Sequence, residues 1–139
     1  MKKIMRCTAA VMLLALIAVS FSACGPDESI EERLFGRSWA GDIGLNDEYG
    51  YSLYSVFQFL PDGTGWEYSY YQDNDERYNT YQFYWQWDGR GTNIILDYGG
   101  NYVSYMENVY VGGGEMTGIY YNDYYSNAPG VRFRLEAGY

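Results

Sequence analysis

The sequence predicts an all-β domain: about eight short antiparallel strands in an up-and-down meander that closes into a small barrel, preceded by a short helix. Three observations support this prediction. Apolar and polar residues alternate with a period of two after residue 37, glycine-rich turns separate the alternating segments, and 20% of the residues are aromatic. Period-two alternation, tight turns and aromatic side chains are all typical of strands.

The helix is predicted at residues 30–35. Ser29 and Glu32 have the spacing of a capping box, in which the serine side chain accepts a backbone hydrogen bond and the glutamate reaches back to the cap. Gly36 follows where glycine often ends a helix. The alternative interpretation is a solvated acidic linker, because residues 27–32 carry four carboxylates.

The clearest strand is predicted at residues 80–88, where one face is aromatic and the other mostly polar. The aromatic face consists of Tyr81, Phe83, Trp85 and Trp87. We expect this face to point into a core. In the last strand, Val131, Phe133 and Leu135 should point inward and Arg132 and Arg134 outward. The remaining strands are predicted at residues 37–43, 49–60, 66–71, 94–98, 102–111, 115–121 and 131–136.

Tight turns are predicted at residues 61–65, 88–91, 99–101 and 112–114, each of which contains glycine. Eight strands joined by such turns favour closure, because a closed barrel has no unpaired edge strand.

The N-terminal segment has the layout of a signal peptide. Lys2, Lys3 and Arg6 precede an uncharged stretch at residues 7–25, whose most apolar part is residues 9–19. A membrane-spanning helix needs about 20 apolar residues. The stretch is shorter than that, which favours cleavage over permanent spanning.

The residues Phe21-Ser22-Ala23-Cys24 resemble the lipobox of bacterial lipoproteins, in which small residues precede a cysteine that is diacylated and becomes the mature N-terminus. The resemblance implies a signal peptide at residues 1–23, a lipidated tether at 24–29, and a single domain at 30–139. Asp27 and Glu28 resemble the tag that exports some lipoproteins to the outer face of the outer membrane. The membrane is then a partner through the lipid on Cys24. The alternatives are ordinary signal-peptidase cleavage with secretion, and an uncleaved membrane anchor.

A second resemblance begins with Leu34-Phe35-Gly36-Arg37-Ser38-Trp39 and continues through Phe57, Phe59 and Asp62-Gly63-Thr64-Gly65. These segments are similar to small lipocalin-like lipoproteins. In lipocalins a Gly-x-Trp tryptophan packs over a closing helix, with an arginine from the last strand across it. The resemblance implies barrel closure by Gly36, Trp39 and either Arg132 or Arg134, although the spacing here is Gly-x-x-Trp.

The residue inventory limits the available chemistry. The chain has no His, and after cleavage it has no Lys and a single Cys committed to lipid. Ser-His-Asp, Cys-His and Schiff-base mechanisms are therefore excluded, as are zinc sites built on His or thiolates. Paired carboxylates remain, but no spacing pairs the acids on or beside strands. These are Glu67, Asp88, Asp97, Glu107 and Glu115. We expect a protein that is not an enzyme and has no cofactor.

Charge excludes one class of partner. The mature chain of 116 residues has six Arg and 18 carboxylates, a formal charge of −12. Binding to nucleic acid is excluded at this charge.

The carboxylates at residues 73–76 are bunched as in calcium loops, but Arg77 stands where a ligand or glycine is expected, which favours a polar hairpin loop.

The chain contains 18 tyrosines. A flat ring with a hydroxyl suits both sugar stacking and protein interfaces. The alternative is that these tyrosines are good strand formers that pair across the sheet. The candidate ligand-binding residues are Tyr51, Tyr68, Tyr70, Trp85, Tyr105 and Tyr120.

The sequence therefore predicts a lipid-anchored, noncatalytic, lipocalin-like binding protein of the cell envelope. Its ligand is a small apolar or amphipathic molecule in the barrel, or a partner protein on the tyrosine-rich surface. Two alternatives remain: a cell-surface glycan-binding or adhesion module, and a structural or inhibitory partner of another envelope protein.

Overall fold

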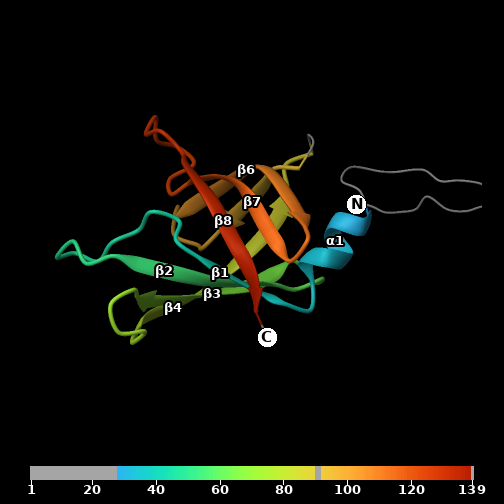
Figure 1. Ribbon diagram of the computed structural model, residues 1–139. Helices are drawn as coiled ribbons and strands as arrows, with labels where there is room; N and C mark the ends of the chain where they lie inside the picture. The colour runs from blue at the N-terminus through green and yellow to red at the C-terminus, as the bar shows by residue number, and fades with distance from the viewer. Residues whose placement is uncertain (1–27, 90–91, 139) are drawn as a thin grey trace, which may run out of the picture.

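Eight antiparallel strands pair in chain order and close into a barrel in the computed structural model, which describes residues 28–89 and 92–138. The first strand completes the barrel by pairing with the last (Figure 1). This confirms the predicted all-β meander. The strands are β1 (Ser38–Gly41), β2 (Leu53–Phe59), β3 (Thr64–Tyr71), β4 (Arg77–Trp87), β5 (Ile94–Asp97), β6 (Val103–Gly112), β7 (Glu115–Tyr121) and β8 (Val131–Gly138).

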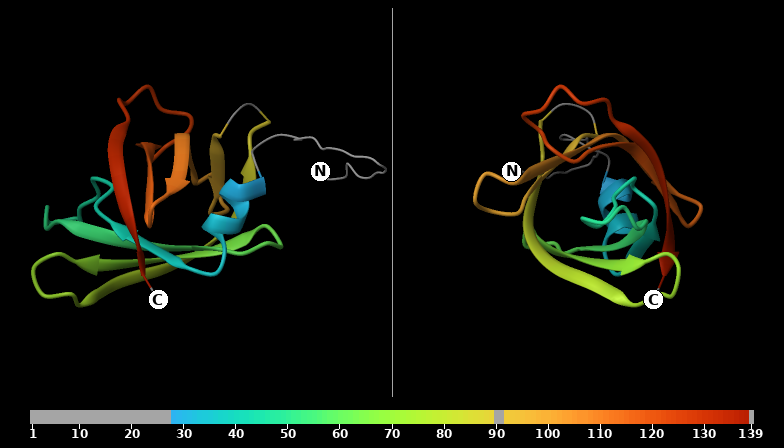
Figure 2. Two further views of the ribbon diagram at one scale, coloured as in Figure 1. Left: turned by 45° about the vertical axis from the view of Figure 1, so that its right-hand side comes forward. Right: turned by 90° about the vertical axis from the view of Figure 1, so that its left-hand side faces the viewer.

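One short helix, α1 (Glu28–Leu34), lies across one end of the barrel. The right-hand view of Figure 2 looks into the ring of strands from the opposite end, with α1 behind it. The helix begins two residues before the predicted position, so Ser29 lies inside it rather than at its cap. Gly36, at φ 76°, turns the chain from α1 toward β1.

Some predictions fall on residues that the structure does not describe. The signal peptide, Cys24 and most of the tether lie within residues 1–27, and part of the turn at 88–91 lies at residues 90–91. Within the described ranges, no helix is long and apolar enough to cross a membrane.

Aromatic side chains fill the half of the interior nearest α1. Trp39, Phe57, Phe59 and Phe83 are at most 1% exposed. The ring of Phe59 meets that of Trp85 edge-on at 5.6 Å and 90°. Edge-to-face contacts add to the free energy gained by burying aromatic area. On β4, Phe83 and Trp85 are buried while Gln82, Tyr84 and Gln86 are exposed, as the alternation predicts.

Strand predictions differ from the structure at the end of the barrel away from α1, where β1 ends at Gly41 rather than residue 43 and β4 begins at Arg77 rather than residue 80. β2 begins at Leu53 rather than residue 49, because residues 49–52 belong to a loop held by an isolated bridge between Asn46 and Ser52. Val131 lies on the same face of β8 as Phe133 and Leu135, but it is 42% exposed because it is the first residue of the strand and lies at the rim of the barrel. Alternation predicts the face on which a residue lies, whereas burial also needs neighbouring structure to cover that face.

β3 makes room for its neighbours with a small residue. A Cβ atom built on Gly65 would lie 2.4 Å from the ring of Phe83 and 2.6 Å from the carbonyl oxygen of Gln58. Gly65 is buried and pairs directly with Phe83 on β4. The Phe83 ring therefore occupies the space that any side chain at position 65 would need.

We predict that Gly65→Ala lowers the free energy of unfolding by about 1–3 kcal/mol, the usual cost of overpacking. Urea denaturation measures this change, and Gln86→Ala on the exposed face of β4 is the control, expected to stay within about 0.5 kcal/mol. The cost should be smaller in a Phe83→Leu background, because one of the two close contacts is removed. An equal cost in both backgrounds would show that Phe83 is not the obstacle.

Candidate functional site

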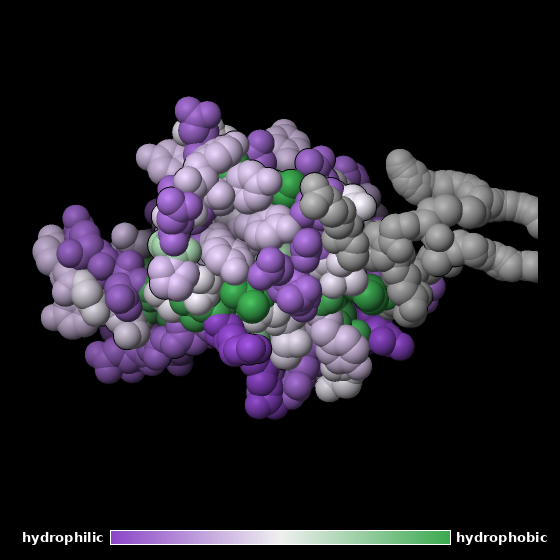
Figure 3. Space-filling view, turned by 90° about the horizontal axis from the view of Figure 1, so that it is seen from above, coloured by the Kyte–Doolittle hydropathy of each residue, from purple (hydrophilic) through white to green (hydrophobic). Residues whose placement is uncertain are grey.

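The end of the barrel opposite α1 is built from four loops, and we call it the loop end. The loops are residues 42–52, 72–76, 98–102 and 122–130. In Figure 1 the first two project to the left, away from α1, and the last projects at the upper left. Together they carry seven carboxylates and no Arg or Lys. Figure 3 shows hydrophilic side chains over this projecting end, whereas hydrophobic ones appear in the middle of the same face and toward the α1 end.

A polar cluster lies inside the barrel just below the loop end. Glu67 on β3 is only 3% exposed. Its carboxyl group accepts a hydrogen bond from the Ser55 hydroxyl at 2.7 Å and another from the Tyr98 hydroxyl at 2.5 Å. Both partners come from other segments of the barrel wall, so the carboxyl group links three parts of the sheet.

Burial controls the protonation of this cluster. Removal from water raises the pKa of Glu67, and the hydrogen bonds from Tyr98 and Ser55 lower it without cancelling that rise. Burial, and then the nearby Glu67 charge, also raise the pKa of Tyr98 well above its usual value. Each of the five described arginines is exposed, so none lies buried beside Glu67 as a counter-ion.

A second interior pair lies at the same end. The Tyr120 hydroxyl donates to the Ser104 hydroxyl at 3.1 Å, and the Ser104 hydroxyl donates to the backbone carbonyl of Asn122 at 2.9 Å. Tyr120 and Ser104 are each 3% exposed. This pair fixes the start of the loop at residues 122–130 to the barrel interior.

Asp47 organises the longest loop. Its carboxylate accepts hydrogen bonds from the backbone N–H groups of Tyr49 and Tyr51, both at 2.9 Å, and from the Tyr71 hydroxyl at 3.0 Å. Burial alone would raise the pKa of Asp47, but these hydrogen bonds outweigh it and the pKa lies below 3.8. Burial and the bond to Asp47 raise the pKa of Tyr71 to about 12. The ionised Asp47 side chain therefore ties residues 47–51 of this loop to Tyr71 on β3, and the Asn46–Ser52 bridge holds the same loop at its base.

Tyrosine rings are exposed on this ordered rim. Tyr49, Tyr51, Tyr102 and Tyr125 are 64% to 79% exposed. Tyr125 contacts the ring of Tyr124 at 5.3 Å, and Tyr124 contacts the ring of Tyr105 on β6 at the same distance. The rim thus presents aromatic rings among carboxylates without a neighbouring basic loop residue.

The six candidate ligand-binding residues do not form one site. Tyr51 is on the rim, and Tyr120 is inside the barrel below it. Trp85 is inside near α1, with its indole N–H donating to the Leu60 carbonyl. Tyr105 is on the outer face of β6, with its hydroxyl donating to Asp88 at 2.6 Å.

Tyr68 and Tyr70 lie together on the outer face of β3. The Arg77 guanidinium is 5.1 Å from the ring of Tyr68 and 5.5 Å from that of Tyr70. Tyr54 stacks on Tyr70 at 5.3 Å, and Trp66 stacks on Tyr68 at 6.4 Å. These contacts form a flat aromatic strip outside the barrel, with Arg77 over part of it.

Glu67 and Ser55 were not among the predicted site residues. The signal that was missed is the alternation of β3, which is the reverse of that in β4. Its aromatic residues face outward, and Gly65, Glu67 and Ser69 face the interior. The pairing of β3 with β2 reveals this phase, because Glu67 lies directly opposite the buried Phe57.

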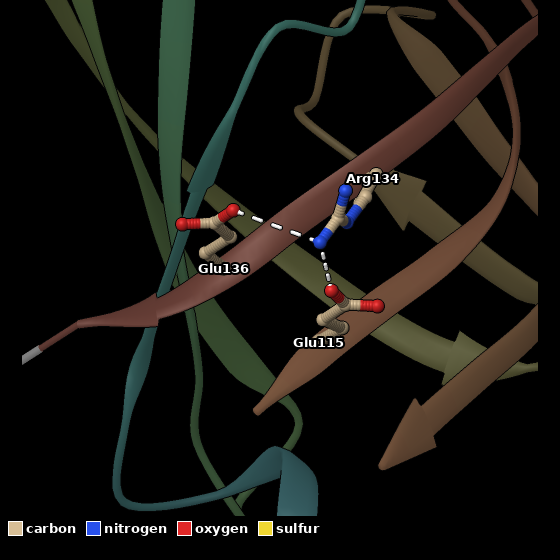
Figure 4. Close-up of polar contacts among 3 residues, drawn as sticks. All are labelled: Glu115, Arg134 and Glu136. Carbon is tan, nitrogen blue, oxygen red and sulfur yellow. Dashed lines mark hydrogen bonds and ion pairs between the residues drawn. The ribbon is translucent and has the colours of Figure 1, made fainter. Parts of the chain in front are cut away.

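The residues implied in barrel closure lie in different places. The Trp39 indole N–H donates to the Leu34 carbonyl at 3.0 Å, which joins the buried ring to α1. The guanidinium nearest this ring belongs to Arg37, 6.0 Å from its centroid. Arg132 and Arg134 are on the outer face of β8, where Arg134 pairs with Glu115 and Glu136 (Figure 4).

The outer wall also has a shallow depression where β6 bulges between Glu107 and Tyr110. It has a volume of about 320 Å³ and is lined by Asn108, Thr117, Gly118, Ile119, Arg132 and Phe133. Apart from Arg132, its lining has no ionisable side chain.

Comparisons with known proteins return no match: no protein-family model, no curated protein and no solved structure is similar to this chain at the level searched. Among residues 28–89 and 92–138, no group of three or more His, Cys, Asp or Glu side chains could hold a metal ion. The function is therefore inferred from the loop end itself.

We predict that Glu67→Gln changes the pH dependence of stability. Below pH 4.5 Glu67 is protonated in both the folded and the unfolded chain, and its ionisation has no effect on folding. As the pH rises from there through the raised pKa of the folded state, ionisation favours the unfolded chain and the native protein loses stability. The advantage of the variant should grow across that window, with a slope of at most about 1.4 kcal/mol per pH unit.

Urea denaturation from pH 4 to pH 8 measures this difference in the free energy of unfolding. Glu48→Gln, at an exposed carboxyl group of the same end, is the control and should change stability by less than about 0.5 kcal/mol. A difference between Glu67→Gln and the native protein that does not vary with pH would contradict the burial argument.

Proposed function

We propose that this protein is a lipid-anchored, noncatalytic binding protein of the cell envelope that holds a partner protein at its loop end. The observation that carries the proposal is the contrast between the two ends of the barrel. The α1 end is closed by a helix over packed aromatic rings, and the loop end presents exposed tyrosines on an ordered rim. Exposed aromatic residues in a polar setting are typical of protein interfaces.

A partner protein fits this geometry better than a small ligand inside the barrel. Aromatic rings occupy the α1 half of the interior, and Glu67, Ser104 and Tyr120 occupy the other half. Glu67 accepts a hydrogen bond from Ser55, and Tyr120 donates one to Ser104. A ligand inside would have to displace these side chains. A partner on the rim would meet rings that are already exposed.

Glycan binding has less support. The aromatic strip around Tyr68 and Tyr70 has the flat shape that sugars stack on, but Arg77 lies over both rings. A sugar would have to displace the guanidinium and lose its cation–π contacts.

The proposed anchor rests on the lipobox-like residues before Cys24. We predict that the native chain carries a lipid on an N-terminal Cys24 and that Cys24→Ala accumulates as an uncleaved, lipid-free precursor. Intact-mass spectrometry of the membrane fraction from a bacterial host measures both. Cys7→Ala, within the predicted signal peptide, is the matched control and should be lipidated normally. Cleavage and release of Cys24→Ala would instead indicate ordinary secretion.

The proposed binding surface is tested by photo-crosslinking in intact envelopes. A photoreactive aromatic residue in place of Tyr51 or Tyr125 should give one adduct of defined mass. The same residue in place of Tyr84 or Tyr110, which are 67% and 59% exposed on the outer wall, should not. Because the four sites are similarly exposed, a difference reports contact rather than access. Adducts formed only at Tyr84 or Tyr110, or the absence of an adduct at all four positions, would contradict the proposal.

A further inference from the structure

We infer that the barrel stands on the membrane in one orientation, with the α1 end facing the lipid surface and the loop end pointing away from it. This inference rests on the lipid anchor at Cys24 proposed above. It adds which surface of the barrel meets lipid headgroups and which is presented to a partner.

The tether is short. Glu28, the first residue of α1, is four residues after Cys24. An extended chain covers at most about 3.6 Å per residue, so the chain from Cys24 to Glu28 spans no more than about 14 Å.

The helix cannot swing away from the barrel to extend that reach. Leu34 is completely buried, and its carbonyl accepts the Trp39 indole N–H. The Arg33 guanidinium donates to the carbonyl of Val111 on β6 at 3.1 Å. The Phe35 ring lies 5.8 Å from that of Trp85. These contacts with three strands make α1 part of the rigid barrel.

The height of the barrel exceeds the reach of the tether. β4 runs the full distance between the ends and has 11 residues. At about 3.3 Å per residue and a tilt of about 40°, it rises about 28 Å along the barrel axis. A barrel inverted onto its loops would hold α1 roughly twice as far from the lipid as the tether allows.

The charge of the loops disfavours an orientation in which the barrel lies on its side with the loops against the lipid. The four loops carry seven carboxylates and no cation, so anionic headgroups repel them. The α1 end carries both signs, with Arg33 and Arg37 exposed near Glu32. It also exposes Leu60, at 38%, in the turn between β2 and β3. Both ends are acidic, but the arginines among the carboxylates of the α1 end make anionic lipid repel it less than the loop end.

Site-specific fluorescence quenching tests the orientation. The lipidated chain is purified from membranes and placed in vesicles of phosphatidylethanolamine and phosphatidylglycerol that carry a nitroxide on the headgroup. Single cysteines replace Pro61 at the α1 end, Gln82 on the outer wall and Asn127 at the loop end, all of them exposed. The lipid occupies Cys24, so each new cysteine is the free thiol for the dye.

Quenching should decrease from Pro61→Cys through Gln82→Cys to Asn127→Cys, with a several-fold difference between the first and last. As a control, a flexible Gly/Ser segment of about 20 residues inserted between Gly25 and Pro26 should remove most of this gradient. Equal quenching at the three sites, a reversed order, or a gradient that the insertion leaves unchanged would overturn the inference. Mass spectrometry separates the two failures, since a lipid-free chain contradicts the anchor, whereas a lipidated chain without a gradient contradicts the orientation alone.

Discussion

The space inside a barrel of eight strands is the constraint on which this structure depends. Such a barrel is just wide enough for side chains to fill, so at some positions a large inward residue needs a small one across from it. The Phe83 ring lies where a side chain at position 65 would be, and Gly118 likewise leaves room for the ring of Phe133. The large aromatic residues of β2, β4 and β8 are compatible with one another because β3 and β7 contribute glycines at these points.

The same constraint accounts for the polar cluster. The inward positions of β3 are Gly65, Glu67 and Ser69, so the strand that provides space also places a carboxyl group in the interior. A buried carboxyl group destabilises a fold unless it is hydrogen-bonded, and Ser55 and Tyr98 supply those bonds. The interior is consequently apolar toward α1 and polar toward the loops. The two ends differ in chemistry before any loop residue is considered.

Most of the fold could be predicted from the sequence, because alternation and turn chemistry are local signals. In β4 both signals agree, and Phe83 and Trp85 point inward as expected. In β3 the aromatic residues Trp66, Tyr68 and Tyr70 indicate the wrong face, since the pairing with Phe57 on β2 and Phe83 on β4 decides which residues of β3 face inward. The candidate site depends on this phase, which is why Glu67 could not be found from local pattern alone. The sequence makes Tyr51 and Tyr120 candidate ligand-binding residues by residue type alone. Only the closed barrel shows that Tyr51 is exposed on the rim and that Tyr120 is buried beneath it.

Connectivity supports the proposal that recognition takes place at the loop end rather than at the α1 end. In an up-and-down barrel with an even number of strands, the two chain ends leave from the same rim, here beside α1. The three turns at that rim contain 12 residues, whereas the four loops at the opposite rim contain 30. Loops vary without disturbing the paired strands, so the rim with the longer loops can change its surface while the barrel stays intact. An anchor that enters through α1 leaves that rim unobstructed, and the hydrogen bonds of Asp47 and Ser104 give it a fixed shape. The proposed attachment at one end and the proposed recognition at the other are then consistent with the order of the strands and the position of the helix.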